Sequence, residues 1–305
     1  MSAITKTSRL TIADINKLYA DGTRFAMLTA YDYPTAKLVD EAGIPLILVG
    51  DSLATVLLGY DSEIRVTVDQ MLHHTAAVVR GAQHALVVGD MPFLSYATPA
   101  EAVENAGRFL QEAGAQAVKM EGGVRSARQI EAVVKAGIPV MAHIGWTPQS
   151  KHAMGGKVRV QGKTADRARQ MIADAFAVQE AGAFAVVLEL VPDELAAALT
   201  ERLSIPTIGI GAGPHCSGEV QVITDLLGWS DWHPRHAKNF ANLHDTILEA
   251  VREYAAQVEA GTFPGPEQTT LMGDPTLDEV LGRSALDLPE GEDRALVAIP
   301  LDRDL

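Results

Sequence analysis

The chain repeats a unit in which a helical segment ends at a glycine and a short run of apolar residues follows. Four examples are "LVDEAGIPLILVGD", "FLQEAGAQAVKMEGG", "VVKAGIPVMAHIG" and "VQEAGAFAVVLEL". Their glycines, Gly43, Gly114, Gly137 and Gly182, stand where a helix would end in a left-handed residue, which glycine adopts without a Cβ penalty. The Val-, Ile- and Leu-rich runs that follow suit parallel strands buried on both faces. The unit therefore predicts an alternation of helices and buried parallel strands.

Eight candidate strands follow this pattern. Eight strands in alternation with helices are typical of a (β/α)8 barrel, or TIM barrel, in the α/β class. An open doubly wound sheet is the structural alternative. The expected strands are residues 25–30, 45–50, 85–90, 116–121, 138–143, 184–189, 205–210 and 220–226.

The composition changes once along the chain, close to its end. Residues 1–265 are expected to form a single catalytic domain that includes an N-terminal helix. Residues 266–305 carry ten acidic residues and three arginines, with no lysine and no aromatic residue. This segment holds half of the net charge of −14 and lacks the large side chains that build a core. It is interpreted as an acidic C-terminal extension, partly mobile or wrapped on a neighbour.

Charge and composition exclude several classes of function. A net charge of −14 repels phosphate backbones, so no nucleic-acid partner is expected. The sequence has no apolar run of about 18 residues and no secretory signal at its start, so no membrane association is expected. Its single cysteine, Cys216, cannot form an intrachain disulfide. That favours a reducing compartment, and we expect a cytoplasmic protein.

Polar residues follow the predicted strands at their C-terminal ends, where barrels carry their chemistry. Four carboxylates on one rim cannot all be ionised and unpaired, because like charges repel, and a divalent cation is the simplest remedy. Oxygen ligands favour Mg²⁺, with Mn²⁺ as an alternative, over Zn²⁺. Any single one of these residues could equally cap a loop or form a rim ion pair. In strand order they are Asp51 and Ser52, Asp90, Lys119 and Glu121, His143, and Glu189.

Nine segments between roughly residues 24 and 264 together resemble one protein family. They are "TAYDYPTAKLVDEAG", "LVGDSLATVLLGYDSEIRVTVDQMLHHTAAVVRGA", "DMPFLSYATP", "VKMEGG", "HIGWTPQS", "GGKVRVQG", "LELVP", "IGIGAG" and "AKNF". The chain closely resembles the ketopantoate hydroxymethyltransferases (3-methyl-2-oxobutanoate hydroxymethyltransferases) of pantothenate biosynthesis. That family is similar to the phosphoenolpyruvate/pyruvate-type barrels, which bind Mg²⁺ and an α-keto acid.

The resemblance implies an enzyme and assigns its site. It implies transfer of a hydroxymethyl group from the co-substrate 5,10-methylenetetrahydrofolate to 3-methyl-2-oxobutanoate, giving 2-dehydropantoate through a Mg-stabilised enolate. It also implies a homo-oligomer, often a homodecamer. By the same resemblance Glu189 is the catalytic acid–base residue. The metal site is Asp51, Asp90 and Glu121, and the substrate-binding residues are Ser52, Asp51, Asp90, Lys119 and His143.

The chemistry of a 2-oxo acid agrees with this site. Its keto and carboxylate oxygens can chelate Mg²⁺, which acidifies the C3–H and stabilises the enolate left by proton removal. A carboxylate is a suitable base for that step if its pKa matches the task. The segment 155–162 lies in a long connection at the catalytic face, so we expect it to cover the substrate.

Two places depart from the usual family pattern. Ser217-Gly218-Glu219 replaces Asp-Gly-Gln, and His236 stands where an aromatic residue is usual. Both are expected at or near the catalytic face, where they would affect loop order and folate contacts.

Two other functions are compatible with such a barrel. One is a Mg²⁺-dependent C–C lyase, but those lyases usually carry a cysteine on a catalytic loop, and Cys216 comes late in the chain. The other is a sensor that binds a keto acid, which would have no need of a base such as Glu189.

Overall fold

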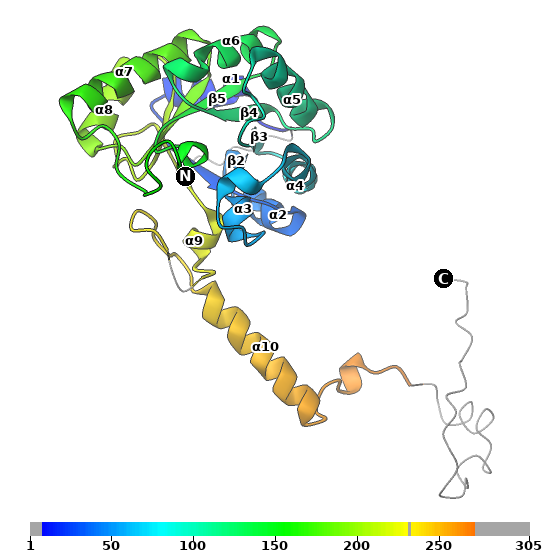
Figure 1. The fold of residues 1–305 in the computed structure, drawn as a ribbon. Helices are drawn as coiled ribbons and strands as arrows, with labels where there is room; N and C mark the ends of the chain where they lie inside the picture. The colour runs from blue at the N-terminus through cyan, green and yellow to red at the C-terminus, as the bar shows by residue number, and fades with distance from the viewer. Residues whose placement is uncertain (1–7, 231–232, 272–305) are drawn as a thin grey trace, which may run out of the picture. The chain divides into compact units, whose positions relative to one another are not determined.

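The structure, a computed structural model, describes residues 8–230 and 233–271. It divides into two compact units, Met1–His244 and Asp245–Leu305, which are described separately. The first unit contains a closed barrel of eight parallel strands that pair in chain order (Figure 1). The predicted (β/α)8 TIM barrel of the α/β class is therefore confirmed. Its strands are β1 (Phe25–Thr29), β2 (Leu46–Val49), β3 (Leu86–Asp90), β4 (Ala117–Glu121), β5 (Val140–Gly145), β6 (Ala185–Glu189), β7 (Thr207–Ile210) and β8 (Gly218–Gln221).

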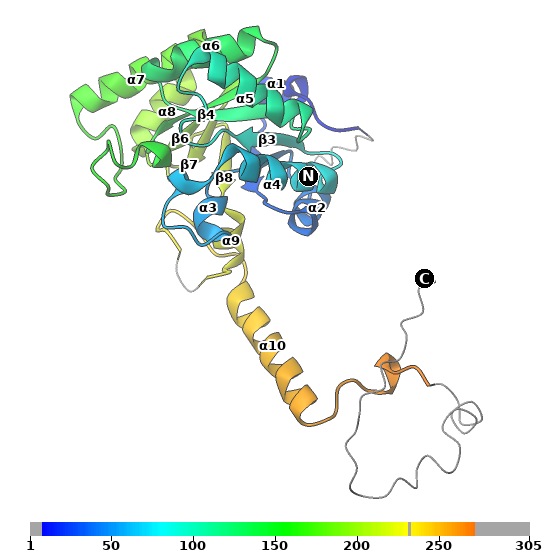
Figure 2. The same ribbon diagram turned by 45° about the vertical axis from the view of Figure 1, so that its right-hand side comes forward.

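Helices surround the outside of this barrel, as Figures 1 and 2 show from two directions. One long helix follows each of the first six strands, whereas β7 passes to β8 through residues 211–217. Two short helices lie after β2 and β8. The helices of the first unit are α1 (Ile12–Ala20), α2 (Tyr33–Glu41), α3 (Leu53–Val56), α4 (Val68–Gly81), α5 (Pro99–Gln111), α6 (Ala127–Lys135), α7 (Ala165–Glu180), α8 (Asp193–Arg202) and α9 (Ile223–Leu227).

Local sequence signals determine where these helices begin. At α4, Thr67 and Gln70 form a capping box in which each side chain accepts a hydrogen bond from the other's backbone N–H. Thr98 and Glu101 form the same arrangement at α5, where Pro99 occupies the first helical position. The four glycines predicted to end helices have φ angles between 78° and 92°, as expected for left-handed residues.

The hydrophobic core has two layers separated by the sheet. The outer layer lies between the barrel and its helices and includes fully buried Phe109 on α5. The inner layer fills the barrel with side chains such as Met27, Leu46 and Met141. Ile15 of α1 belongs to the inner layer, and Tyr19 donates a hydrogen bond to the carbonyl of Leu203, which lies just before β7. Helix α1 therefore closes the N-terminal end of the barrel, and the C-terminal end remains available for an active site.

Six strands lie within their predicted ranges, and two extend beyond them. The fifth strand was expected to end at His143 but runs on to Gly145, because residues 141–145 pair with β6. The eighth strand was expected at 220–226 but is Gly218–Gln221. The apolar, β-branched Val222 and Ile223 resemble strand residues, yet the backbone N–H of Ile223 donates to the Thr29 hydroxyl and α9 begins there.

The second unit contains most of helix α10 (Leu243–Glu259) and a single 3-10 turn at Pro266–Gln268. Residues 272–305, most of the predicted acidic extension, lie outside the described residues. The predicted boundary between a catalytic domain 1–265 and an extension 266–305 stays a prediction. Among the helices of residues 8–230 and 233–271, none combines the length and apolarity needed to span a bilayer.

Candidate active site

A cavity of about 620 Å³ opens at the C-terminal ends of the strands. This is the end at which (β/α)8 barrels carry their active sites. The structure brings six of the seven predicted site residues to its wall. They are Asp51, Ser52, Asp90, Lys119, His143 and Glu189.

Asp51, Asp90 and Lys119 form a buried, hydrogen-bonded cluster on one side of the cavity. The ammonium of Lys119 lies 2.9 Å from Asp90 Oδ1, and the backbone N–H of Asp51 donates to Asp90 Oδ2 at 3.0 Å. Burial raises the pKa of Asp90 to about 8, although the charge of Lys119 opposes that rise. Burial alone would lower the pKa of Lys119, but the charges of Asp90, Asp51 and Glu121 outweigh it and raise the pKa. When both carboxyl groups are ionised, the cluster would carry more negative charge than one lysine neutralises, so an added cation would stabilise the ionised form.

Glu121, the seventh predicted residue, lies behind the cavity wall and is 1% exposed. Its Oε1 lies 3.5 Å from His143 Nδ1, and its Oε2 accepts a hydrogen bond of 3.2 Å from the backbone N–H of Gln149. Burial raises the pKa of Glu121, and its hydrogen bond with His143 opposes that rise. Because Glu121 and His143 pair in register on β4 and β5, the barrel itself sets their separation.

His143 links the buried cluster to the open part of the cavity. Its Nδ1 lies 3.2 Å from the ammonium of Lys119, and its Nε2 lies 3.2 Å from Glu189 Oε2. Burial and the charge of Lys119 lower the pKa of His143, but hydrogen bonding with Glu121 and Glu189 raises it to about 9. The side chain of Glu189 is 17% exposed, whereas that of His143 is 4% exposed. Glu189 is thus the carboxylate that His143 holds at the open cavity.

Two tyrosines and a glutamine support these groups, and sequence reasoning missed all three. Tyr31, 2% exposed, shares a hydrogen bond of 2.8 Å with the hydroxyl of Ser52. Gln149 donates to Asp51 Oδ2 at 2.9 Å, and Tyr96 donates to Gln149 Oε1 at 2.5 Å. Each of the three lies within a segment that carried the family resemblance. Their positions in the sequence, however, do not indicate which site residue each one contacts.

The donors of this site suit a hard cation. Among the described residues, no group of three His, Cys, Asp or Glu side chains is arranged to hold a metal ion. Asp51 and Asp90 nevertheless lie side by side, 5% and 1% exposed, and burial raises the pKa of Asp90. Buried carboxylate oxygens carrying excess negative charge are the donors that Mg²⁺ prefers, so the chemistry of the residues fits that ion.

Loops complete the cavity wall. Val158, Arg159 and Val160, from the predicted covering segment 155–162, line the cavity, as does His236. The other departure from the family pattern, at residues 217–219, was wrongly placed. Gly218 pairs with Phe25, the first residue of β1, so residues 217–219 lie at the N-terminal end of the barrel, away from the cavity. The prediction failed because β7 and β8 are parallel, so residues 211–217 cross from the C-terminal end of β7 to the N-terminal end of β8.

A parallel eight-stranded barrel with a buried lysine and carboxylates at its C-terminal mouth is the architecture of a TIM-barrel enzyme. Solved structures share this fold. A phosphonopyruvate hydrolase complex with oxalate and Mg²⁺ has a TM-score of 0.56 and 14% identity, over 91% of this chain and 97% of that chain. A 2,3-dimethylmalate lyase, a PEP mutase/isocitrate lyase superfamily member, has a TM-score of 0.56 and 17% identity, over 90% and 95%. At these identities the likeness concerns the fold alone.

Sequence relatives are much closer. The family model for ketopantoate hydroxymethyltransferase matches residues 9–266. A 3-methyl-2-oxobutanoate hydroxymethyltransferase of Chloroflexus aurantiacus is 60% identical over 275 residues, 90% of this chain and 97% of the relative. One of Dehalococcoides mccartyi is 53% identical over 274 residues, 89% of this chain and 98% of the relative. The chain therefore belongs to the ketopantoate hydroxymethyltransferase family and is an enzyme of it, which confirms the resemblance found in the sequence.

Proposed function

We propose that the chain transfers a hydroxymethyl group from 5,10-methylenetetrahydrofolate to 3-methyl-2-oxobutanoate, giving 2-dehydropantoate in pantothenate biosynthesis. Family membership and the names of the relatives support this reaction. The observation that carries it is the pair of His143 and Glu189, 3.2 Å apart, at the edge of a buried Lys119–Asp90 cluster. A carboxylate base at the open cavity, beside the buried ammonium of Lys119 and the buried carboxyl groups, suits removal of a proton next to a keto group.

The keto acid would be held by Ser52 and Lys119. Tyr31 restricts the hydroxyl of Ser52 through their 2.8 Å hydrogen bond, so the hydroxyl is oriented before substrate arrives. The ammonium of Lys119, buried and anchored on Asp90, places a positive charge where negative charge develops on the keto oxygen. Because the lysine is already fixed, little reorganisation is needed during the reaction.

Of the three predicted metal residues, Asp51 and Asp90 would hold Mg²⁺ at the cavity, with Gln149 orienting Asp51. Glu121 would add negative charge from behind the cavity wall. When bound, the ion would supply a Lewis acid that polarises the keto group of the substrate. The residues prepare this site by burial, which raises the pKa of Asp90 and makes a bound cation favourable.

Glu189 would remove the proton from C3 of the keto acid. It lines the open cavity, and its Oε2 lies 3.2 Å from His143 Nε2. The resulting carbanion, delocalised onto the keto oxygen near Lys119, would form the new C–C bond to the one-carbon unit. A water molecule would supply the hydroxyl oxygen, the bonds from this carbon to the folate nitrogens would break, and tetrahydrofolate would leave. Segment 155–162 would cover the reactants.

Substitution of Glu189 by Gln tests this role. Glu189→Gln keeps the shape and hydrogen-bonding capacity but cannot accept a proton as a carboxylate does. We expect kcat to fall by roughly 10² to 10⁴, while binding of Mg²⁺ and of the keto acid changes little. Exchange of the C3 hydrogen with deuterated solvent, followed by NMR with the keto acid alone, should slow by a similar factor.

Glu63→Gln is the matched control, since Glu63 lines the same cavity and is not among the residues that contact the His143 ring. Its exchange rate should stay within a few-fold of the parent. Exchange at the parent's rate in Glu189→Gln would assign proton removal to another group and overturn this role.

The lyase remains a second candidate function, since some structures of similar fold are lyases. Its usual cysteine has no counterpart at the site, because Cys216 is buried between β7 and β8 and does not line the cavity. A sensor only binds its ligand and does not require a base, so the Glu189 side chain at the cavity argues against a sensor function.

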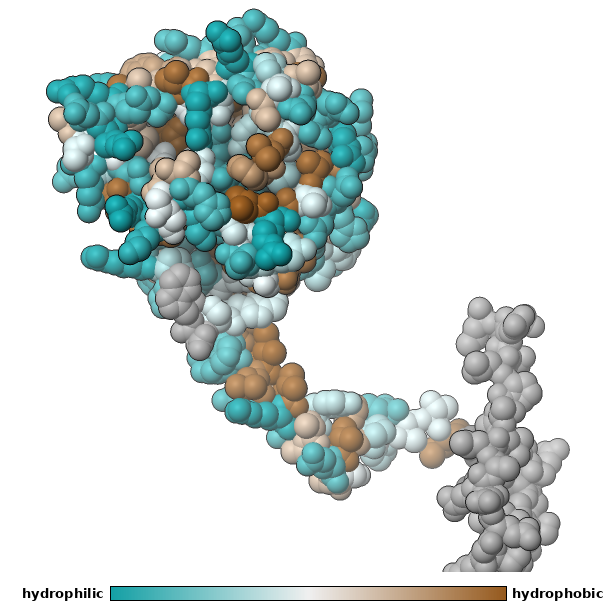
Figure 3. Space-filling model, viewed as in Figure 1, coloured by the Kyte–Doolittle hydropathy of each residue, from teal (hydrophilic) through white to brown (hydrophobic). Residues whose placement is uncertain are grey.

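We further propose a homo-oligomer, a homodecamer by resemblance, located in the cytoplasm. An exposed apolar stripe on α10 supports association. Its residues recur at helical spacing, and Figure 3 shows hydrophobic colour along this helix. The stripe is Ile247, Val251, Tyr254 and Val258, between 39% and 58% exposed.

A further inference from the structure

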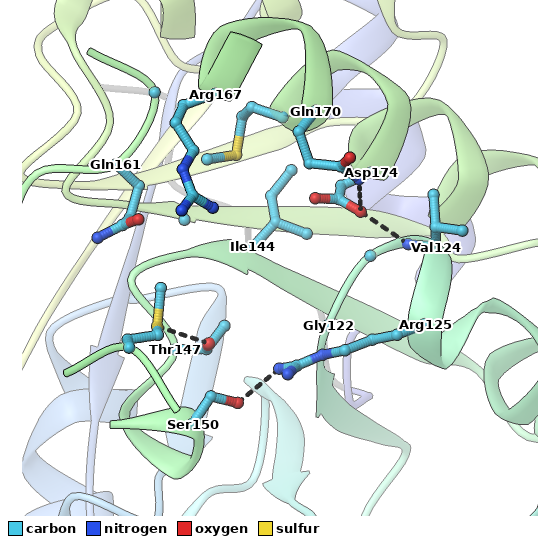
Figure 4. A pocket seen from close by; sticks show the side chains of 15 residues that line it. Gly122, Val124, Arg125, Ile144, Thr147, Ser150, Gln161, Arg167, Gln170 and Asp174 are labelled. Carbon is cyan, nitrogen blue, oxygen red and sulfur yellow. Dashed lines mark hydrogen bonds between the residues drawn. The ribbon is translucent and has the colours of Figure 1, made fainter. Parts of the chain in front are cut away.

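A second cavity, of about 430 Å³, lies on the outer side of the barrel, against helix α7. Figure 4 shows it enclosed by α7, the segment that follows β4, and the long connection between β5 and α7. Its volume is in the range of small-molecule sites. None of the residues proposed above for the keto acid or the metal lines it.

Strand β5 and the connection that follows it line both this cavity and the active-site cavity. On β5, His143 lines the active-site cavity and its neighbour Ile144 lines the second one. Trp146 and Lys151 face the first cavity, whereas Thr147 and Ser150 face the second. Further along the same connection, Val160 lines the active-site cavity and the next residue, Gln161, lines the second cavity. The two cavities therefore lie on the two sides of one stretch of backbone.

The lining combines an apolar floor with two cationic groups. Ile144 and Met171, 2% and 6% exposed, form part of the floor, which suits an aromatic ring. The guanidinium groups of Arg125 and Arg167 enter from different walls, as Figure 4 shows. Arg125 donates a hydrogen bond to the neutral hydroxyl of Ser150 at 2.6 Å.

Neither arginine is neutralised by a neighbouring acid. Within the described residues, the Arg167 side chain has no hydrogen-bond or ion-pair partner, and Arg125 has no ion pair. The carboxylate in this cavity, Asp174, accepts hydrogen bonds from the backbone N–H of Val124 and from Gln170. Two guanidinium groups free to bind, beside an apolar floor, match a ligand with an aromatic ring and carboxylates.

We propose that this cavity binds the p-aminobenzoyl-glutamate end of the folate co-substrate, with Arg125 and Arg167 holding the glutamyl carboxylates. The proposal rests on the proposed function, which requires a folate whose reactive end lies in the active-site cavity. One molecule lying over the connection between β5 and α7, which lines both cavities, would place one end in each.

Kinetics with two co-substrates test the assignment. In Arg167→Gln we expect the KM for 5,10-methylenetetrahydrofolate to rise about tenfold, the usual loss for one charge-assisted hydrogen bond. The KM for the keto acid and the rate of C3 hydrogen exchange should not change. With the pteroate analogue, which lacks glutamate, parent and variant should have the same KM. Arg125→Gln should behave similarly.

Arg169→Gln is the control on the same helix. Arg169 is exposed, pairs with Asp166 and does not line the cavity, so its KM values should match the parent's. An unchanged folate KM in Arg167→Gln, or an equal rise with the pteroate analogue, would overturn the proposal.

Direct binding separates this proposal from the proposed function. Calorimetry should detect p-aminobenzoyl-L-glutamate binding to the parent protein, at least tenfold weaker binding to Arg167→Gln, and weaker binding of p-aminobenzoate to both. This readout needs no catalysis, so it stands if hydroxymethyl transfer is absent. If inorganic phosphate or free L-glutamate binds the parent as tightly as p-aminobenzoyl-L-glutamate does, the cavity is a site for free anions and the assignment fails.

Discussion

Replacing Glu219 by Gln should stabilise the protein, and the gain should grow with pH. Glu219 lies on β8 near the N-terminal end of the barrel, where its Oε1 accepts a hydrogen bond of 3.0 Å from Gln221. Burial raises the pKa of Glu219 from 4.5 to about 7, although Gln221 and Arg24 oppose that rise. The folded protein therefore prefers the neutral carboxyl group.

The sign follows from linkage between proton binding and folding. Between about pH 4.5 and pH 7 the unfolded chain has lost this proton while the folded protein keeps it, so stability falls as pH rises through this window. At roughly 1.36 kcal/mol per pKa unit the full loss would be about 3.4 kcal/mol. Glu219 is partly exposed, and solvent screening reduces this to about 1–2 kcal/mol.

Urea unfolding followed by circular dichroism at pH 5 and pH 8 measures the effect. Glu219→Gln cannot ionise, so its free energy of unfolding should equal the parent's within about 0.5 kcal/mol at pH 5 and exceed it by about 1–2 kcal/mol at pH 8. Glu201→Gln, an exposed change on α8, should give no such pH-dependent difference. The same stability difference at both pH values, or a variant less stable than the parent at pH 8, would refute the reasoning.

Two further predictions concern the metal site and the chain's end. Asp51→Asn should abolish most metal-dependent activity and weaken Mg²⁺ binding in calorimetry, and parent turnover in excess chelator would contradict the metal assignment. Asp90→Ala should in addition lower the free energy of unfolding by about 3–5 kcal/mol, because it leaves the buried ammonium of Lys119 unpaired. Deleting residues 267–305 should leave the barrel folded, and a large drop in the thermal midpoint would show that this segment packs on the barrel or across subunits.

The sequence by itself determined the barrel, because its signals are local. A glycine such as Gly43 ends a helix in a left-handed conformation, and the apolar run after it has to be buried on both faces. Repeated around the chain, these two signals leave few architectures other than eight alternating strands and helices. Strand ends then collect Asp51, Asp90, Lys119 and Glu189 on one rim.

Tertiary structure alone decided which partners these residues find. Gln149 reaches Asp51 across 98 residues of sequence, and Tyr31 reaches Ser52 from the loop after another strand. Such contacts depend on loops whose paths are set by packing, and a loop leaves no periodic pattern in the sequence.

Only the fold, likewise, separates Glu121 behind the cavity wall from Glu189 at the open cavity, although both end a strand. Arg125 and Arg167 meet at one cavity because α7 packs against the 3-10 turn Val124–Ser126, which follows β4. The sequence predicts which residue types follow each strand. Burial and distance, which set pKa values and choose partners, arise only when the barrel closes.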